Sequence, residues 1–259
     1  MIEYIQVIWS SLILQLKRQR ANKFFWFMVT VQPMIFATVG FILFQGSEEE
    51  NFLLYVVLGV GMMSIWSMSL FASGISILIE RFLGTLEVLF GSPAPFEFVM
   101  LGKGLANACF GLIGLGVAIL YSWAVLHIPL QLASPGFFFC ALLLTIFSLT
   151  CLGVILATFF TLARAVQAFV NLLEYPIIIL SGLMFPLSLL PQWTYPFSMI
   201  LSPTWGIQAL RKAALGNTEG IWLDIGAICI LSLVYLVIAY ILVHKMDSHA
   251  RKTGQLVYY

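Results

Sequence analysis

The protein has 259 residues, a formal net charge of +1, and a composition that is 61% hydrophobic and only 9% charged. Soluble domains carry about 25% charged residues, so this composition excludes an ordinary soluble domain, and no nucleic-acid partner is expected. Apolar stretches of roughly 20 residues, the length that crosses about 30 Å of hydrocarbon, recur along the chain. We therefore expect an all-α integral membrane protein.

Residues 1–23 are expected to form an amphipathic helix that lies in the cytoplasmic interface of the membrane. Apolar residues recur there at helical spacing, namely Ile2, Ile5, Trp9, Leu12, Ile13 and Leu16. A basic segment from Lys17 to Lys23 follows them. The alternative is a soluble helix that packs on a partner protein.

The remainder of the chain, residues 24–259, is expected to form one domain of six transmembrane helices. They are predicted at about 24–44, 52–79, 104–126, 136–162, 168–186 and 221–243. The segment between the last two is apolar, but prolines recur in it at positions 186, 191, 196 and 203. Because proline interrupts helices, no continuous helix of spanning length fits between those positions.

The distribution of basic residues predicts the orientation, because loops rich in Lys and Arg stay in the cytoplasm. The loop after the first predicted span carries Glu48, Glu49 and Glu50 and no basic residue. With six spans and a cytoplasmic N-terminus, only Arg211 and Lys212 of the 12 basic residues are external. We therefore expect a multi-pass protein of the cell (inner or plasma) membrane with both termini in the cytoplasm.

The cytoplasmic loop between the second and third predicted spans contains the motif ERFLGTLEVLFGSPAP, which runs from Glu80 to Pro95. Wound as a helix, the motif has apolar side chains on one face and a small, acidic face opposite. The acidic face consists of Glu80, Gly84, Glu87 and Gly91. Such a face would let another protein approach closely, although a helix that only anchors the loop in the interface has the same pattern.

This motif, with Gly102 and Lys103 beyond it, resembles the cytoplasmic loop of type-2 ABC exporter permeases, a class of drug, antibiotic and polysaccharide exporters. The stretch from Pro191 to Arg211 is also similar to the family's pattern before its last span. The resemblance implies that the loop forms a coupling helix that docks into a groove of the ATPase subunit, and that two short re-entrant helices lie outside. It assigns the coupling role to Glu80, Arg81, Gly84, Thr85, Leu86 and Glu87.

The sequence itself offers no site for ATP chemistry. The nearest approach to a phosphate-binding loop, Gly102-Lys103-Gly104, has Glu97 where the upstream glycine is needed and lacks the following Ser or Thr. We therefore expect no cofactor or metal in this chain, with ATP and Mg²⁺ bound by a separate P-loop ATPase subunit. The histidines are not spaced as metal ligands, and the chain is expected not to be catalytic.

Polar residues inside the spans are candidates for the substrate path. One stripe at helical spacing on the second predicted span leads toward Glu80 and consists of Met62, Trp66, Ser69, Ser73 and Ser76. Such a stripe suits an amphiphilic substrate, or its serines bond to their own helix and permit close packing. Glu174 is a further candidate, because a carboxylate in hydrocarbon needs a partner such as Arg164, a cavity, or the headgroup level.

Together these features predict the transmembrane permease subunit of an ATP-driven ABC exporter that moves a lipophilic or amphiphilic substrate out of the cytoplasm or inner leaflet. Six spans are half the usual complement for this class, so we expect a pair of permeases, a homodimer, in contact with membrane lipid. The alternatives are an exporter of lipid-linked glycan or polysaccharide, a membrane-embedded lipid-modifying enzyme, and a non-transporting assembly factor. The enzyme would need clustered His, Asp or Glu at one membrane depth.

Overall fold

The computed structural model describes residues 2–44, 52–85, 94–128, 132–162, 165–184 and 186–253. Within these ranges the protein is helical and has no strand, so the predicted all-α class is confirmed there. The α-helices are α1 (Ile2–Ala21), α2 (Lys23–Phe44), α3 (Phe52–Phe82), α5 (Phe96–Ala124), α6 (Pro135–Leu162), α7 (Val166–Leu180), α8 (Tyr195–Ile200), α9 (Ser202–Leu215) and α10 (Ile221–Thr253). Two short 3₁₀ turns precede α8, namely η1 (Leu187–Leu189) and η2 (Gln192–Thr194).

Five of these helices are long and apolar enough to cross a membrane, namely α2, α3, α5, α6 and α10. The structure differs from the prediction at the fifth span, 168–186. There the apolar helix α7 has only 15 residues, and at about 1.5 Å per residue it is shorter than the hydrocarbon core of about 30 Å. The helix gives way to a turn in which Gly182 adopts a φ of 69°, whereas the apolar sequence continues past that turn.

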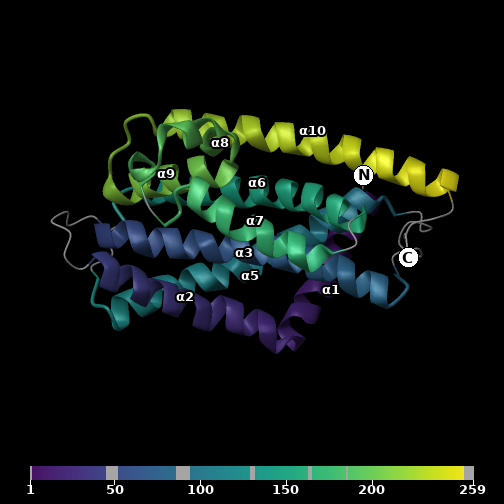
Figure 1. Ribbon diagram of the computed structural model, residues 1–259, viewed down its shortest axis with the longest axis horizontal. Coiled ribbons are helices and arrows are strands. Elements are labelled where there is room, and N and C mark those ends of the chain that lie inside the picture. Colours follow the sequence, from purple (N-terminus) through teal and green to yellow (C-terminus); the bar gives the residue numbers. More distant parts are fainter. Residues whose placement is uncertain are drawn as a thin grey trace.

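Helix α3 occupies the middle of the bundle (Figure 1). It contacts α2, α5, α6, α7 and α9. Its close approach to α5 depends on a small residue, because a Cβ atom at Gly111 would lie 2.7 Å from the Cα of Ile65. Met62 and Trp66 are fully buried in this core. Most of α3 is therefore enclosed by protein, and its two ends lie at opposite ends of the bundle.

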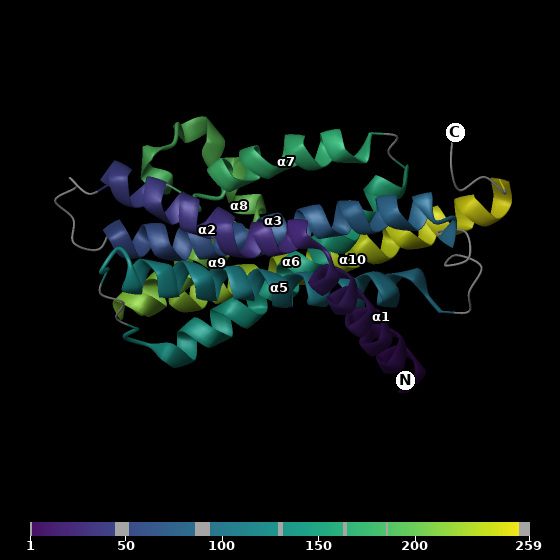
Figure 2. The same cartoon turned by 90° about the horizontal axis from the view of Figure 1, so that it is seen from below.

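Helix α1 departs from the direction of the other long helices and packs mainly on α5 (Figure 2). Two of its polar side chains, Gln15 and Gln19, are buried, whereas the apolar Ile5 and Trp9 are exposed together with Lys17 and Arg20. An apolar face turned outward is what a helix in the membrane interface needs. The interfacial location of this helix stays a prediction.

Between α7 and α10 the chain forms short helices rather than one spanning helix. Pro196 and Pro203 stand in the first turns of α8 and α9, where the missing N–H of proline is tolerated. Helix α9 packs against α6 and α10, at the end of the bundle where α3 begins (Figure 1). The external, re-entrant placement of these helices stays a prediction.

Candidate functional site

The last turn of α3 holds a buried ion cluster centred on Glu80. Its Oε1 atom accepts hydrogen bonds from Nη1 of Arg18 and from Nζ of Lys103, both at 2.9 Å. Thr85 donates its hydroxyl to the other carboxylate oxygen. Glu80 and Lys103 are only 7% and 5% exposed. The Glu80 carboxylate is therefore shielded from water, and it joins α1, α3 and α5.

A second group of polar side chains adjoins this cluster. Oδ1 of Asn107 accepts hydrogen bonds from Nε2 of Gln15 at 3.1 Å and from Nε2 of Gln19 at 2.6 Å. Nδ2 of Asn107 lies 3.5 Å from the hydroxyl of Ser73 on α3. Because hydrogen bonds strengthen one another in a buried network, α1 is tied to α3 and α5 by more than apolar packing.

Arg81 connects the end of α3 to the end of α6. Its Nη2 atom donates to the carbonyl oxygens of Phe160 and Thr161, at 3.2 and 2.7 Å. These carbonyls belong to the last turn of α6, where backbone oxygens lack partners within the helix. A guanidinium at that position satisfies them and complements the negative end of the helix dipole. The end of α3 is thus fixed by both Glu80 and Arg81.

Only the first part of the predicted coupling helix, up to Thr85, lies within the described residues. Helix α3 ends at Phe82, and Gly84 has a φ of 66°, in the left-handed region that glycine adopts readily. Of the predicted acidic face, Glu80 is buried and Gly84 is exposed, and Gly91 lies outside the described residues. Leu86 and Glu87 lie outside the described residues.

The predicted substrate stripe is enclosed within the protomer. All five of its residues are buried, namely Met62, Trp66, Ser69, Ser73 and Ser76. Helix α6 covers part of it, since a Cβ atom at Gly153 would lie 3.4 Å from the hydroxyl of Ser73. The indole N–H of Trp66 and the hydroxyls of Ser69 and Ser76 have no hydrogen-bond partner among the described residues. Such buried groups are uncommon in folded proteins, so they hold unused hydrogen-bonding capacity.

Glu174 lies on α7 and is buried, with α3 alongside it. One of its carboxylate oxygens accepts a hydrogen bond from the hydroxyl of Ser67 at 2.7 Å. Ser67 follows Trp66 by one residue, which is about 100° around the helix. The structure therefore does not bring Glu174 to the stripe. Its predicted partner Arg164 lies outside the described residues.

Comparison with known proteins establishes the class of this protein. The sequence profile of the ABC-2 type transporter family matches residues 5–215, which run from α1 to the end of α9. The chain belongs to the ABC-2 type transporter family. A search of curated proteins finds no match. The resemblance inferred from the loop motif is confirmed, and the chain is a multi-pass membrane protein, the permease component of an ABC transporter.

Three residues that hold the permease together are missing from the predicted site. Lys103 and Asn107 interrupt the apolar sequence of α5 four residues apart, a spacing that puts them on one helix face. That spacing is the signal that could have indicated a common buried partner. Ser67 carries a weaker signal, because serines are frequent throughout α3 and only its position opposite α7 distinguishes it.

Proposed function

We propose that this ABC-2 permease is the membrane subunit of an ATP-driven exporter, and that a separate P-loop ATPase subunit binds the ATP and Mg²⁺. The observation that carries the proposal is the family match over residues 5–215. A permease of this family is the membrane component of an ABC transporter, which implies an ATPase partner. The permease itself moves the substrate and catalyses no chemical step.

The end of the bundle that carries Glu80 faces the cytoplasm in this proposal. Arg18, Arg81 and Lys103 all lie at this end, around the last turn of α3. Arg211 lies at the opposite end, beside the carbonyl of Tyr55 near the start of α3. Since loops rich in basic residues are retained in the cytoplasm, α8 and α9 are external and both termini are cytoplasmic.

The ATPase docks on the loop that follows α3. The family resemblance implies six coupling residues, and we assign the docking surface to four of them, Gly84, Thr85, Leu86 and Glu87. Glu80 and Arg81 contribute to coupling from inside the permease. Glu80 binds side chains of α1 and α5, and Arg81 binds the end of α6. A displacement of the loop by the ATPase is thereby passed to three helices at once.

The substrate path follows the stripe on α3. In this structure the stripe is buried within the protomer. The indole N–H of Trp66 and the hydroxyls of Ser69 and Ser76 have no hydrogen-bond partner among the described residues. When α3 and α6 separate, a substrate or water satisfies these groups. A mainly apolar path with a few hydroxyls suits a lipophilic or amphiphilic substrate that enters from the cytoplasm or inner leaflet.

A second copy of the permease completes the exporter. Helices α2, α7 and α10 carry large apolar side chains on the protein surface, for example Ile35, Leu172 and Val237. Apolar surface of this extent is covered by lipid or by another helix bundle. Mass measurement of the purified complex in a lipid nanodisc should give two permeases and two ATPase subunits.

Affinity purification of the tagged permease from its native membrane, followed by mass spectrometry, tests the proposal. A P-loop ATPase should co-purify in stoichiometric amount, and transport in proteoliposomes should require its ATP hydrolysis. A lipid-modifying activity that purifies with the permease and needs no ATPase would contradict the exporter. Stimulation of ATP hydrolysis by small amphiphiles or by lipid-linked glycans then identifies the substrate class.

A further inference from the structure

A cavity of about 300 Å³ lies at the end of the bundle where α3 begins. The start of α3, the turn after α7, η1 and α9 form its walls. Its lining includes Tyr55, Ser181, Ser188, Gln208 and Arg211. Ligand sites range from about 300 to 1,000 Å³, so this cavity suits a small polar group rather than a whole amphiphile.

Arg211 is held in this cavity by backbone oxygens. Its Nη1 donates to the carbonyl of Gly182 at 3.0 Å, and its Nη2 donates to those of Leu183 at 3.0 Å and Tyr55 at 3.3 Å. The guanidinium carbon lies 4.4 Å from the centre of the Tyr55 ring, a distance typical of cation–π contacts. Gly59 permits this approach, because a Cβ there would lie 1.9 Å from the Leu183 oxygen. The guanidinium is therefore positioned before any ligand binds.

The charge of Arg211 has no carboxylate partner in the part of the chain that the structure describes. The residue is only 5% exposed, and its Nε atom has no hydrogen-bond partner in the same ranges. Burial lowers the pKa of the Arg211 guanidinium to about 10, so the group remains charged at neutral pH. A buried charge is unfavourable unless it is paired, so an anion in this cavity would be stabilised.

The adjacent Lys212 differs from Arg211 because it has a partner. Its Nζ lies 2.6 Å from Oδ2 of Asp224, at the start of α10. Lys212 also lines the cavity, together with neutral hydrogen-bond donors such as Gln208 and Asn217. Arg211 therefore supplies the positive charge of the cavity that remains uncompensated, and the amides can bind the remaining oxygens of an anion.

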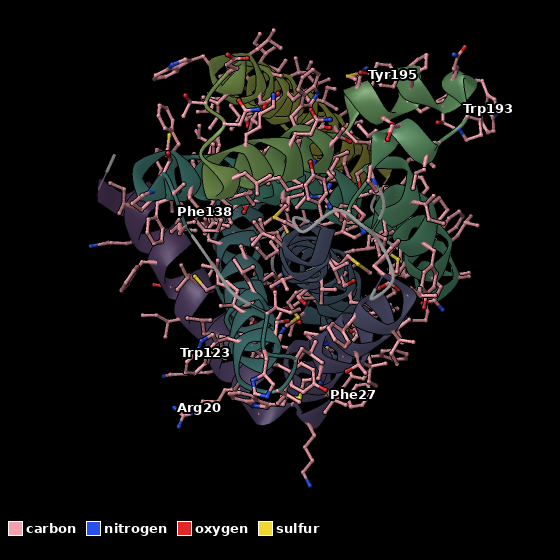
Figure 3. The ribbon with its side chains drawn as sticks, turned by 90° about the vertical axis from the view of Figure 1, so that its left-hand side faces the viewer. Arg20, Phe27, Trp123, Phe138, Trp193 and Tyr195 are labelled. Carbon is pink, nitrogen blue, oxygen red and sulfur yellow. The ribbon has the colours of Figure 1, made fainter. Side chains whose placement is uncertain are left out.

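Aromatic side chains indicate how deep this cavity lies in the membrane. Trp193 and Tyr195 extend outward from the bundle (Figure 3) and are 71% and 53% exposed. Trp123 at the end of α5 and Trp222 at the start of α10 are exposed at the same end of the bundle. Because exposed Trp and Tyr gather at the membrane–water interface, the cavity lies at headgroup level.

We propose that this cavity binds a phosphate group at headgroup level, carried by an anionic lipid or free in solution. The phosphate oxygens accept hydrogen bonds from the side-chain amides of Gln208 and Asn217, and the charge of the Arg211 guanidinium in the cavity wall stabilises the anion. The inference rests on the proposed function only in placing this end of the bundle outside the cell. Binding itself follows from the fixed guanidinium of Arg211, which has no carboxylate partner among the described residues.

Native mass spectrometry of the permease in nanodiscs of phosphatidylcholine and phosphatidylglycerol tests the inference. The Gln208→Glu variant puts a carboxylate into the cavity, about one helical turn from Arg211, with little change in volume. We expect it to retain about tenfold less phosphatidylglycerol than the parent protein. Gln192→Glu is the matched control, because it adds the same charge on the exposed η2 turn and should retain lipid like the parent.

Ser188→Trp provides a second, uncharged way to block the cavity. Ser188 lines it from an exposed position, so the variant should fold and lose phosphatidylglycerol to a similar extent. Inorganic phosphate separates the two sources of the ligand. Displacement of the lipid by phosphate would show that the phosphate group alone is recognised, and lipid that stays bound would show recognition of the lipid headgroup.

Equal retention of phosphatidylglycerol by the parent, Gln208→Glu and Ser188→Trp proteins would overturn the inference. So would a loss of lipid in Gln192→Glu as large as in Gln208→Glu, because the effect would then come from surface charge. The assay contains no ATPase, so its failure leaves the exporter proposal intact. Failure of an ATPase to co-purify would equally leave the lipid retention unchanged.

Discussion

Two buried cations beside opposite ends of α3, Lys103 and Arg211, are held in different ways. At the end of α3 that we propose to be cytoplasmic, Lys103 shares the carboxylate of Glu80 with Arg18, so opposite charges meet inside the protein. At the other end, Arg211 is held by carbonyl oxygens and by the ring of Tyr55. No carboxylate within the described ranges neutralises it. The Glu80 carboxylate offsets one of the two positive charges beside it, whereas the charge of Arg211 meets no carboxylate in the described ranges and is free to attract the anion that we propose.

This difference shows that a buried cation can either connect helices or remain available to a ligand. A cluster with its own carboxylate connects helices firmly, because removing one member leaves an unpaired buried charge. A cation held by neutral oxygens keeps its net charge while its position is fixed, so it can attract a ligand without loosening the fold. Four sets of substitutions test this contrast, beginning with the largest expected effect.

Replacing Glu80 by Leu should destabilise the permease most. Lys103, which is 5% exposed, would lose its carboxylate, and breaking a buried pair in this way costs about 3–5 kcal/mol. The melting temperature of the detergent-solubilised protein should therefore fall sharply. The double variant Glu80→Leu with Lys103→Leu should recover part of the loss, because no buried cation remains. A single variant that melts like the parent would show that the cluster does not hold the helices.

Replacing Arg211 by Met should destabilise the protein less, by about 2–3 kcal/mol. Three carbonyl oxygens lose a charged donor, but water can enter the cavity and bind them. The same melting assay measures the effect, with Arg211→Lys as the variant that keeps the charge and should fall in between. A loss as large as that of Glu80→Leu would mean that the two ends of α3 do not differ in kind.

Two substitutions of Gly84, near Glu80, distinguish the effect of backbone strain from the loss of ATPase docking. Its φ of 66° strains a β-branched residue by roughly 1–2 kcal/mol, so Gly84→Val should lower stability slightly. Asn tolerates this conformation, and no atom of the described residues lies within 4 Å of a Cβ placed there, so Gly84→Asn should melt like the parent. Both variants should reduce ATP hydrolysis coupled to transport. Normal hydrolysis with Gly84→Asn would remove this residue from the docking surface.

Replacing Ser69, which lies between the two ends of α3, should have the smallest effect on stability. Its hydroxyl is buried without a partner among the described residues, so Ser69→Ala should change stability by less than about 0.5 kcal/mol or raise it. Transport should nevertheless fall if the stripe contacts the substrate. Unchanged transport in Ser69→Ala and Ser76→Ala proteoliposomes would restrict the stripe to a packing role.

Helix positions were predictable from the sequence where apolar length alone determines them. The predicted span 24–44 agrees with α2, which starts at Lys23 and ends at Phe44, because charged or polar residues border it on both sides. The predicted span 168–186 is longer than α7, because hydropathy does not reveal the turn at Ser181 and Gly182 within a mainly apolar stretch. The helix therefore ends before the turn at Gly182, although the apolar sequence continues.

The partners within the site were not predictable in the same way. Glu80 is 62 residues from Arg18 and 23 residues from Lys103 in sequence, so no local pattern links the three. Their contact depends on α1 lying across α5, which is a tertiary arrangement. Arg211 and Lys212 are neighbours in sequence, yet only Lys212 has a carboxylate partner among the described residues, because the start of α10 lies beside it.

The enclosure of α3 also has a consequence for the insertion of the protein during synthesis. Helix α3 is the second of the long apolar helices to leave the ribosome, but α5, α6, α7 and α9, which cover it, are all made later. Ser67 meets the Glu174 carboxylate only after a further 107 residues of chain. Until then the serines of α3 face lipid or a membrane insertase. The nascent α2–α3 hairpin is therefore the intermediate that most needs an insertase to shelter its polar side chains.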